Sequence, residues 1–200
     1  FLYLDSGALY RAVTLFAIRN GLTGENGSVD AAALSASLPE INVSFRNADD
    51  GSHTYLGDEC VDQDIRTIEV SSYVSPVAVI PEVRDFVDRI LRDYGKAGRV
   101  VMDGRDIGTT VFPDADLKIF MVADVNVRAM RRLKEMRASG SDTDLETVLD
   151  NLRTRDYIDS HRETSPLRQA GDAIVLDNTN MTLEDQMVWL RDIIRQKFGD

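Results

Sequence analysis

The apolar residues of this chain change their spacing from one segment to the next, which predicts both buried strands and helices. FLYL, at residues 1–4, is a short apolar run typical of a buried strand. Ser6 follows it as a candidate N-cap for a helix that continues to Asn20 and closes at Gly21. A second helix is predicted over about residues 29–37.

Residues 38–64 have a different pattern. INVSFR alternates apolar and polar positions, NADDGS is a turn sequence, and HTYLGDECV has the pattern of a second strand. Two such runs joined by a turn predict a β-hairpin. We therefore expect residues 38–64 to form an antiparallel insert.

Helices and strands alternate again from Ile65 onward. The first predicted helix starts at Ile65, and three more cover 81–94, 124–138 and 145–162. Thr182 caps the last predicted helix. The strands among them are RVVMD, LKIFMVA and AIVLD, and a long loop, DGRDIGTTVFPDA, overlaps the end of the first. This alternation predicts an α/β fold, a three-layer αβα arrangement with a parallel sheet covered on both faces.

Ligands of such folds bind at the carboxyl ends of the strands, so the residues that follow each strand are the first candidates for chemistry. Asp5, Ser6 and Gly7 follow FLYL, DGRD at 103–106 closes the next strand, and Asp124 follows LKIFMVA. DGRD places three charges beside a glycine, which lets the backbone approach a ligand closely. A solvated loop is the alternative interpretation of DGRD.

Arg11 lies in a helix that is apolar almost all round, SGALYRAVTLFAIRN. A helix of this composition is largely buried, and a buried arginine needs an anionic partner. The partner is either an aspartate of the protein or an anion of a ligand, and the sequence leaves both open.

The predicted helix 145–162 has one apolar stripe that continues into charge. The stripe begins with Leu145, Val148, Leu149 and Leu152 and reaches Arg155, Asp159 and Arg162 at helical spacing. A solvated face would lie opposite the leucines, so we expect the charged end to face a polar cleft. The alternative is a ladder of surface ion pairs.

The predicted helix 124–138 is rich in arginine and carries Arg128, Arg131, Arg132 and Arg137. Like charges this close repel one another unless an anion binds. The following ASGSDTD is small and polar, which suits a mobile turn. Helix, turn and second arginine-bearing helix together predict a lid over phosphates.

Net charge narrows the class of partner. The formal net charge is −11, which argues against a nucleic-acid groove and against binding to an anionic membrane. The cations are 19 Arg and 4 Lys, and the guanidinium group grips phosphate with two hydrogen bonds. The bias indicates local phosphate sites, although GC-rich codon usage explains it equally well.

The cysteine and histidine content adds little chemistry of its own. Cys60 is the single cysteine, which excludes an internal disulfide and fits a reducing, cytoplasmic compartment. His53 and His161 have no cysteine or carboxylate at metal-ligand spacing in the sequence, so we expect ordinary surface residues. No extended apolar face is evident, and we expect a monomer.

Five segments of the chain, in order, resemble the bacterial cytidylate kinase family. They are LDSGALYRA, IRTIEVSSYVSPVAVIPEVR, MDGRDIGTTVFPDADLKIF, RDYIDSHRETSPL and LDNTNMTLEDQ. The resemblance covers essentially the whole chain and implies a fold of the P-loop nucleoside monophosphate kinase type. It also implies transfer of the γ-phosphoryl group of ATP, with Mg²⁺, to CMP or dCMP, giving CDP or dCDP and ADP.

The resemblance assigns roles at the base and the sugar of the substrate. It implies that Ser75, Arg84 and Asp106 read the cytosine, and that Arg155 and Asp159 bind the sugar. A carboxylate accepts a hydrogen bond from the N4 amino group of cytosine, whereas uracil presents an acceptor there. Asp159 would accept from a 2′-hydroxyl, which only CMP has.

The resemblance also assigns a clamp on the phosphate of CMP. It consists of Arg11, Arg105 and Arg162, with Ser6 and Tyr10 lining the same site. We expect Arg162→Ala to lower turnover strongly but to affect the fold little, because a cleft arginine without substrate would mostly contact water.

The family's domain organisation is implied in the same way. Residues 1–37 and 65–200 would form the kinase core, 38–64 an insert that belongs to the CMP-binding region, and about 131–162 the lid. Arg131 matches the arginine of the lid that faces ATP. Arg105, Arg131 and Arg162 are then the catalytic arginines, and the resemblance implies no metal ligand in this chain.

One departure from the family pattern is serious. No G-x-x-x-x-G-K-[ST] phosphate loop occurs in the sequence, and FLYL matches the second strand of the family. We therefore expect the first strand, phosphate loop and helix to be missing, and the chain as given to be inactive alone. The alternatives to a cytidylate kinase are a non-catalytic nucleotide-binding truncation and a kinase for another nucleoside monophosphate, such as AMP or UMP.

Overall fold

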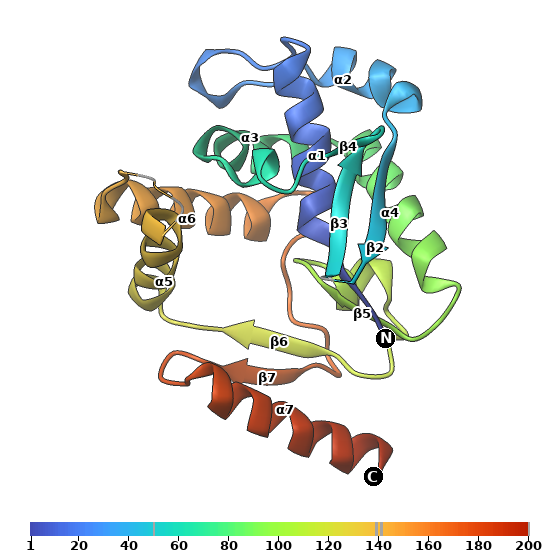
Figure 1. Cartoon of the computed structure of the whole chain (residues 1–200), viewed down its shortest axis with the longest axis vertical. Helices are drawn as coiled ribbons and strands as arrows, with labels where there is room; N and C mark the ends of the chain where they lie inside the picture. Colours follow the sequence, from blue (N-terminus) through green and yellow to red (C-terminus); the bar gives the residue numbers. More distant parts are fainter. Residues whose placement is uncertain (50, 139, 141, 200) are drawn as a thin grey trace. The chain divides into compact units, whose positions relative to one another are not determined.

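The computed structural model describes residues 1–49, 51–138, 140 and 142–199 and divides into two compact units. The first unit comprises Phe1–Asp114 and Arg155–Arg168, and the second comprises Ala115–Thr154 and Gln169–Asp200. Each unit combines helices with a pair of parallel strands (Figure 1). The predicted α/β class is thus confirmed.

The first unit contains most of the secondary structure. Its elements are β1 (Leu2–Asp5), α1 (Ser6–Arg19), η1 (Glu25–Gly27), α2 (Ala31–Ser37), η2 (Leu38–Glu40), β2 (Val43–Ala48), β3 (Gly51–Leu56), β4 (Glu59–Cys60), η3 (Asp64–Arg66), α3 (Ile68–Ala78), α4 (Pro81–Gly95), β5 (Val100–Asp103) and η4 (Ile107–Val111). The C-terminal part of α6 (Leu145–His161) also belongs to it.

The second unit contains β6 (Ile119–Val122), α5 (Val125–Ala138), the N-terminal part of α6, β7 (Ile174–Asp177) and α7 (Leu183–Phe198). β6 and β7 are parallel and lie side by side (Figure 1). Ala129 and Leu133 of α5 pack with Val148 of α6 in a small apolar core. No helix among the described residues is both long enough and apolar enough to span a membrane.

The carboxyl ends of β1 and β5 meet at one edge of the first unit. The two strands are parallel, and their register pairs Leu2 with Val100 and Asp5 with Asp103. The residues that follow each strand are consequently neighbours, although about a hundred residues separate them in the sequence. This edge carries the first two clusters that the sequence singled out.

The N-cap of α1 is Asp5, so the prediction of Ser6 as the cap is wrong. The Asp5 backbone is extended, and its carboxylate accepts a hydrogen bond of 3.1 Å from the backbone N–H of Ala8. Ser6 is already helical. Its hydroxyl is therefore available to donate a hydrogen bond of 2.6 Å to the backbone carbonyl of Asp103.

HTYLGDECV is two strands rather than one. β3 ends at Leu56, Gly57 turns the chain at φ +62°, and β4 pairs back with β3. Only glycine adopts this backbone region without steric cost. The antiparallel sheet therefore has the order β2–β3–β4, as Figure 1 shows beside α1.

The loop after β5 is partly helical. The prediction made residues 103–115 a loop, but Ile107–Val111 forms a π-helical segment. The N–H groups of Thr110 and Val111 both donate to the carbonyl of Asp106, at 2.8 and 3.4 Å. These bonds fix the backbone of Asp106 within the site.

The core of the first unit surrounds α1. Leu9, Ala12 and Val13 are fully buried, which confirms that this apolar helix is central. Leu4 of β1 and Val83 of α4 belong to the same cluster, each with no exposed surface. Each such side chain contributes about 1.5–3 kcal/mol on burial, so α1 forms a rigid support for the polar residues at its N-terminal end.

Candidate functional site

Gly104 brings the loop after β5 against the start of α1. A Cβ atom at this position would lie 2.2 Å from the Ser6 hydroxyl and 2.7 Å from Ile107. Any other residue here would force the side chains of Ser6 and Ile107 to move. The glycine thereby sets where the next two residues, Arg105 and Asp106, leave the strand.

Arg84 and Asp106 form a buried ion pair. Arg84 lies on the apolar face of α4 beside Val83 and Val87 and is only 1% exposed. Its Nη2 donates to Oδ2 of Asp106, and its Nη1 donates at 3.2 Å to the carbonyl of Ala78. A charged residue in the middle of a buried helix face is costly unless it is paired, and this pair satisfies that condition.

Arg162 joins the same carboxylate from the end of α6. Its Nη2 lies 3.6 Å from Oδ1 of Asp106, and its Nη1 lies 3.7 Å from Oδ1 of Asp159. Its Nε donates at 2.8 Å to the carbonyl of Ser165. The side chain of Arg162 is 3% exposed, so the expectation that it mostly contacts water is wrong.

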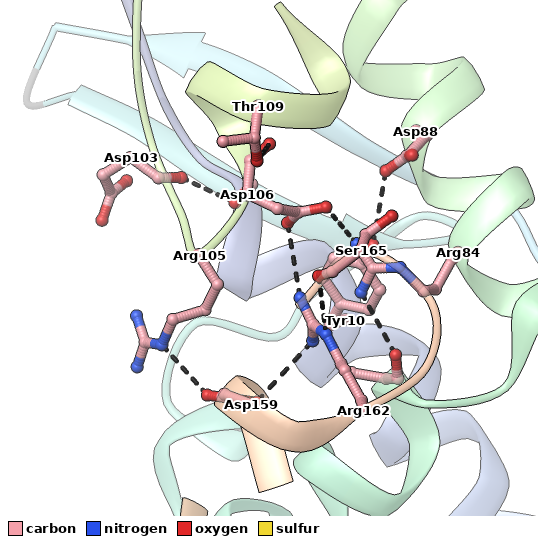
Figure 2. Close-up of polar contacts among 12 residues, drawn as sticks. Tyr10, Arg84, Asp88, Asp103, Arg105, Asp106, Thr109, Asp159, Arg162 and Ser165 are labelled. Atoms are coloured by element: carbon pink, nitrogen blue, oxygen red, sulfur yellow. Dashed lines mark hydrogen bonds and ion pairs between the residues drawn. The ribbon is translucent and has the colours of Figure 1, made fainter. Parts of the chain in front are cut away.

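Asp159 connects this buried centre to the loop after β5. Its Oδ2 accepts a hydrogen bond of 3.1 Å from Nε of Arg105. Asp159 is buried, whereas the side chain of Arg105 is 47% exposed. Figure 2 shows Arg84, Asp106, Arg162, Asp159 and Arg105 pointing toward one another in one continuous chain of charges, which we call the arginine–aspartate network.

Burial of the α6 charges supports the prediction drawn from its stripe. Val148 packs in the apolar core of the second unit, and the same face reaches Asp159 and Arg162, both buried, in the first. A surface ion-pair ladder would leave these groups solvated. The ladder interpretation of Asp159 and Arg162 is therefore wrong.

Tyr10 and Asp88 lie beside Arg84. The ring of Tyr10 lies beneath the Arg84 guanidinium, 5.5 Å from its centroid, and its hydroxyl donates at 3.4 Å to Oδ1 of Asp88. Burial, and then the charge of Asp106, raise the pKa of the Asp88 carboxyl. Burial also raises the pKa of the Tyr10 hydroxyl.

Asp88 was not identified from the sequence, although a signal was present. It follows Arg84 by four residues and shares the helix face of Val83, Val87 and Leu91. Opposite charges at core positions of an otherwise apolar stripe indicate a buried polar network.

Two donors of the network have no hydrogen-bond acceptor among the described residues. They are Nε of Arg84 and Nη2 of Arg162, and both are buried. Burial, and then the charge of Arg84, lower the pKa of Arg162. Two neighbouring cations with unsatisfied N–H groups favour a ligand with an anionic or acceptor group.

Three further candidates belong to the same unit as this network. Arg11, on α1, donates at 3.2 Å from Nη1 to the carbonyl of Ile65 and is partly buried. Ser75 is buried on α3, and Arg155 is partly buried on α6, one turn before Asp159. Their roles toward a ligand stay predictions.

Arg131 belongs to the second unit, on α5. Its Nη1 donates at 3.1 Å to Oδ1 of Asn178, and its Nη2 donates at 2.8 Å to the carbonyl of the same residue. It also reaches the carbonyl groups of Thr179 and Met181. Arg131 thus fixes the turn after β7.

The predicted lid falls partly outside the described residues. Ser139 and Ser141 of the turn ASGSDTD are not described. On α5, Arg132 lies 3.6 Å from Glu135, which offsets part of the repulsion expected among the arginines of this helix. The lid itself stays a prediction.

His53 differs from its expected role as an ordinary surface residue. It is partly buried, and its Nδ1 lies 2.7 Å from Oδ2 of Asp62. This pair was not readable from the sequence, because it depends on the pairing of β3 with the residues around β4.

Comparison with known proteins gives one consistent result. A family profile described as cytidylate kinase matches residues 1–196. A cytidylate kinase of Porphyromonas gingivalis is 49% identical over 202 residues, covering 100% of this chain and 87% of the relative. Those of Parabacteroides distasonis and Phocaeicola vulgatus are 50% and 47% identical, over 98% and 96% of this chain and 86% and 84% of the relatives.

Proposed function

The chain belongs to the cytidylate kinase family, and from this premise we propose that the arginine–aspartate network is its site for CMP or dCMP. The reaction of the family is transfer of the γ-phosphoryl group of ATP to CMP or dCMP, which yields CDP or dCDP and ADP. The observation that carries the assignment is the buried carboxylate of Asp106 between Arg84 and Arg162.

Asp106 is the proposed reader of the base. Its carboxylate accepts from the N4 amino group of cytosine, while Arg84 donates to the acceptor atoms of the ring and Ser75 lines the same pocket. Uracil would present an oxygen to Asp106 and leave a buried carboxylate facing an acceptor. Such a mismatch in a site built for a donor costs several kcal/mol.

The arginines beside Asp159 are the proposed phosphate clamp. Arg105 is half exposed and Arg162 has a buried donor without an acceptor, so both can donate to the oxygens of a phosphate. Arg11, Ser6 and Tyr10, all on α1, would line the same site. Phosphoryl transfer depends mainly on positioning and on neutralising charge, and no general base is required of these residues.

The remaining assignments concern the sugar and ATP. Arg155 and Asp159 would bind the ribose, with Asp159 accepting from the 2′-hydroxyl of CMP. Arg131 would face ATP from the lid over about residues 131–162, and residues 38–64 would be an insert of the CMP-binding region. The kinase core would comprise residues 1–37 and 65–200.

Mg²⁺ would accompany ATP, and Asp103 with Asp5 is the acidic pair of this chain that fits it. The two residues end adjacent parallel strands, and the pKa of Asp103 is raised first by burial and then by the charge of Asp5. A divalent cation relieves this kind of repulsion and prefers carboxylate oxygens. Asp5 and Asp103 would hold the ion, and Mg²⁺ would supply neutralisation of the phosphate charge of ATP.

Binding and turnover are separate properties of this chain. The proposed CMP contacts come mainly from the arginine–aspartate network, so we propose that CMP binding can be measured apart from phosphoryl transfer. A monomeric state, a cytoplasmic location and the absence of nucleic-acid and membrane partners stay predictions.

Calorimetric titration with CMP and UMP tests the proposal in the chain as it exists. The wild type should bind CMP at least about tenfold more tightly than UMP, and Asp106→Asn should reduce that ratio. The amide can rotate to offer either a donor or an acceptor, so discrimination should shrink more than CMP affinity falls. An unchanged ratio in Asp106→Asn would remove base reading from this residue, and tighter binding of AMP or UMP would favour another substrate.

A further inference from the structure

His53, Cys60 and Asp62 form a second group of chemically reactive side chains, on the antiparallel sheet. The imidazole, thiol and carboxylate each offer one atom that can bind a metal, and these atoms lie within 4.8 Å of one another. None of the three residues belongs to the arginine–aspartate network, although all of them lie in the insert 38–64. We call them the β3–β4 cluster.

The pairing of β3 with β4 brings these residues together. Tyr55 pairs with Cys60 across the two antiparallel strands, so His53 lies two residues further along, opposite Asp62. Residues two apart point to the same face of a strand. His53, Cys60 and Asp62 therefore share one face of the sheet.

Two of the three side chains are already held in place. Asp62 accepts at 2.8 Å from the backbone N–H of Thr54 with Oδ1, while its Oδ2 lies 2.7 Å from Nδ1 of His53. Their side chains are 29% and 28% exposed. Cys60 is exposed, so the cluster is open to solvent on its side.

We propose that the β3–β4 cluster binds a divalent metal ion of the zinc class. Thiolate, imidazole and carboxylate together are a donor set that Zn²⁺ favours, at about 2.0–2.3 Å from the ion. Ligand atoms of a tetrahedral zinc ion at those bond lengths lie about 3.4–3.6 Å apart, so small side-chain rotations bring the cluster into range. Solvent would supply the fourth ligand from the exposed side.

The donor set distinguishes this ion from the Mg²⁺ that accompanies ATP. Mg²⁺ prefers oxygen ligands and binds sulfur and imidazole poorly, whereas Zn²⁺ and Co²⁺ accept both. The ion would also join β4 to β3 at a point where β4 contributes only Glu59 and Cys60. Metal binding should therefore stabilise the small sheet as well as protect the Cys60 thiol.

Cobalt titration of the chelator-treated protein tests the proposal, because tetrahedral Co²⁺ with a thiolate ligand has an intense visible and near-ultraviolet spectrum. The wild type should bind about one Co²⁺ per chain with a thiolate charge-transfer band, and Zn²⁺ should bleach it. Cys60→Ser should lose the band. His53→Gln and Asp62→Asn should weaken Co²⁺ binding at least about tenfold.

Asp58→Asn provides the matched control. Asp58 lies in the turn between β3 and β4, its carboxylate is fully exposed, and its ion-pair partner is Arg46. It should leave the Co²⁺ spectrum and affinity unchanged. Zn²⁺ should raise the thermal midpoint of the wild type but not that of Cys60→Ser. Cys60 is exposed, so this variant should fold, and far-ultraviolet circular dichroism verifies that. A pale octahedral spectrum in the wild type, or an equal spectrum in Cys60→Ser, would overturn the proposal.

Discussion

Arg105 and Asp159, 54 residues apart in the sequence, are joined by a hydrogen bond of 3.1 Å between Nε and Oδ2. The side chain of Arg105 is 47% exposed, whereas that of Asp159 is 6% exposed. The bond thus connects a solvent-facing cation to the buried part of the arginine–aspartate network. This difference in burial separates the expected effects of mutating each arginine.

Arg105→Ala should weaken CMP binding without destabilising the fold. Its half-exposed ion pair contributes at most about 1 kcal/mol to stability. Loss of a charge-assisted hydrogen bond to phosphate, about 1.5–3 kcal/mol, corresponds to roughly ten- to a hundredfold weaker binding. Calorimetry and a thermal melt on the same sample measure both effects, and an unchanged CMP affinity would exclude Arg105 from the clamp.

Arg162→Ala should weaken CMP binding and also destabilise the protein. Removing one partner of a buried ion pair costs about 3–5 kcal/mol, and Arg162 faces both Asp106 and Asp159. Denaturant unfolding measures this loss. Arg153→Ala, at an exposed position of the same helix, is the control. If the two variants were equally stable, Arg162 would be solvated in solution.

Asp159→Ala should weaken CMP more than dCMP. The loss of affinity common to CMP and dCMP reports the release of Arg105 and Arg162. Any further loss of affinity for CMP alone reports the contact with the 2′-hydroxyl. A single charged acceptor for that hydroxyl corresponds to roughly tenfold or more in the affinity ratio. Equal losses in paired titrations would mean that Asp159 only positions the arginines.

Asp88→Asn should stabilise the protein near neutral pH, by an amount that depends on pH. The pKa of Asp88 is raised in the folded state, so the folded protein holds this proton more tightly than the unfolded chain does. Stability of the wild type should therefore fall as pH rises from the ordinary value of 3.8 through the raised one. Asparagine does not titrate and removes this loss.

Thermal melts from about pH 4 to pH 8 measure the difference in stability between Asp88→Asn and wild type. The difference should widen with rising pH and then level off. Asp85→Asn, an exposed position on the same helix, should give a flat profile. Asp88 also lies 3.8 Å from Nη2 of Arg92. A variant less stable than wild type at every pH would show that the contacts of Asp88 with Tyr10 and Arg92 outweigh the cost of its burial.

Patterns within one element were readable from the sequence. The alternation in INVSFR predicted β2, and the stripe of α6 placed Asp159 and Arg162 on the buried face. Both predictions follow from the periodicity of strands and helices, which does not depend on residues distant in the sequence. The strand ends that carry Asp5 and Asp103 were found for the same reason.

Contacts that depend on pairing between elements were not readable. The β3–β4 cluster requires the register that pairs Tyr55 with Cys60, and no local pattern determines which strand lies beside which. The burial of Arg162 likewise depends on Asp106, from a different segment of the chain. The N-cap at Asp5 was missed because both Asp and Ser suit that position.

Gly104 has a consequence for how this site can vary. Any substitution of Gly104 adds a Cβ atom, and that atom would lie 2.2 Å from the Ser6 hydroxyl. A smaller residue at position 6 would remove this contact, but the bond from the Ser6 hydroxyl to the Asp103 carbonyl would then be lost, and the added atom would still lie 2.7 Å from Ile107. Positions 6 and 104 are therefore coupled, and a library randomised at both should retain few pairs other than the native one.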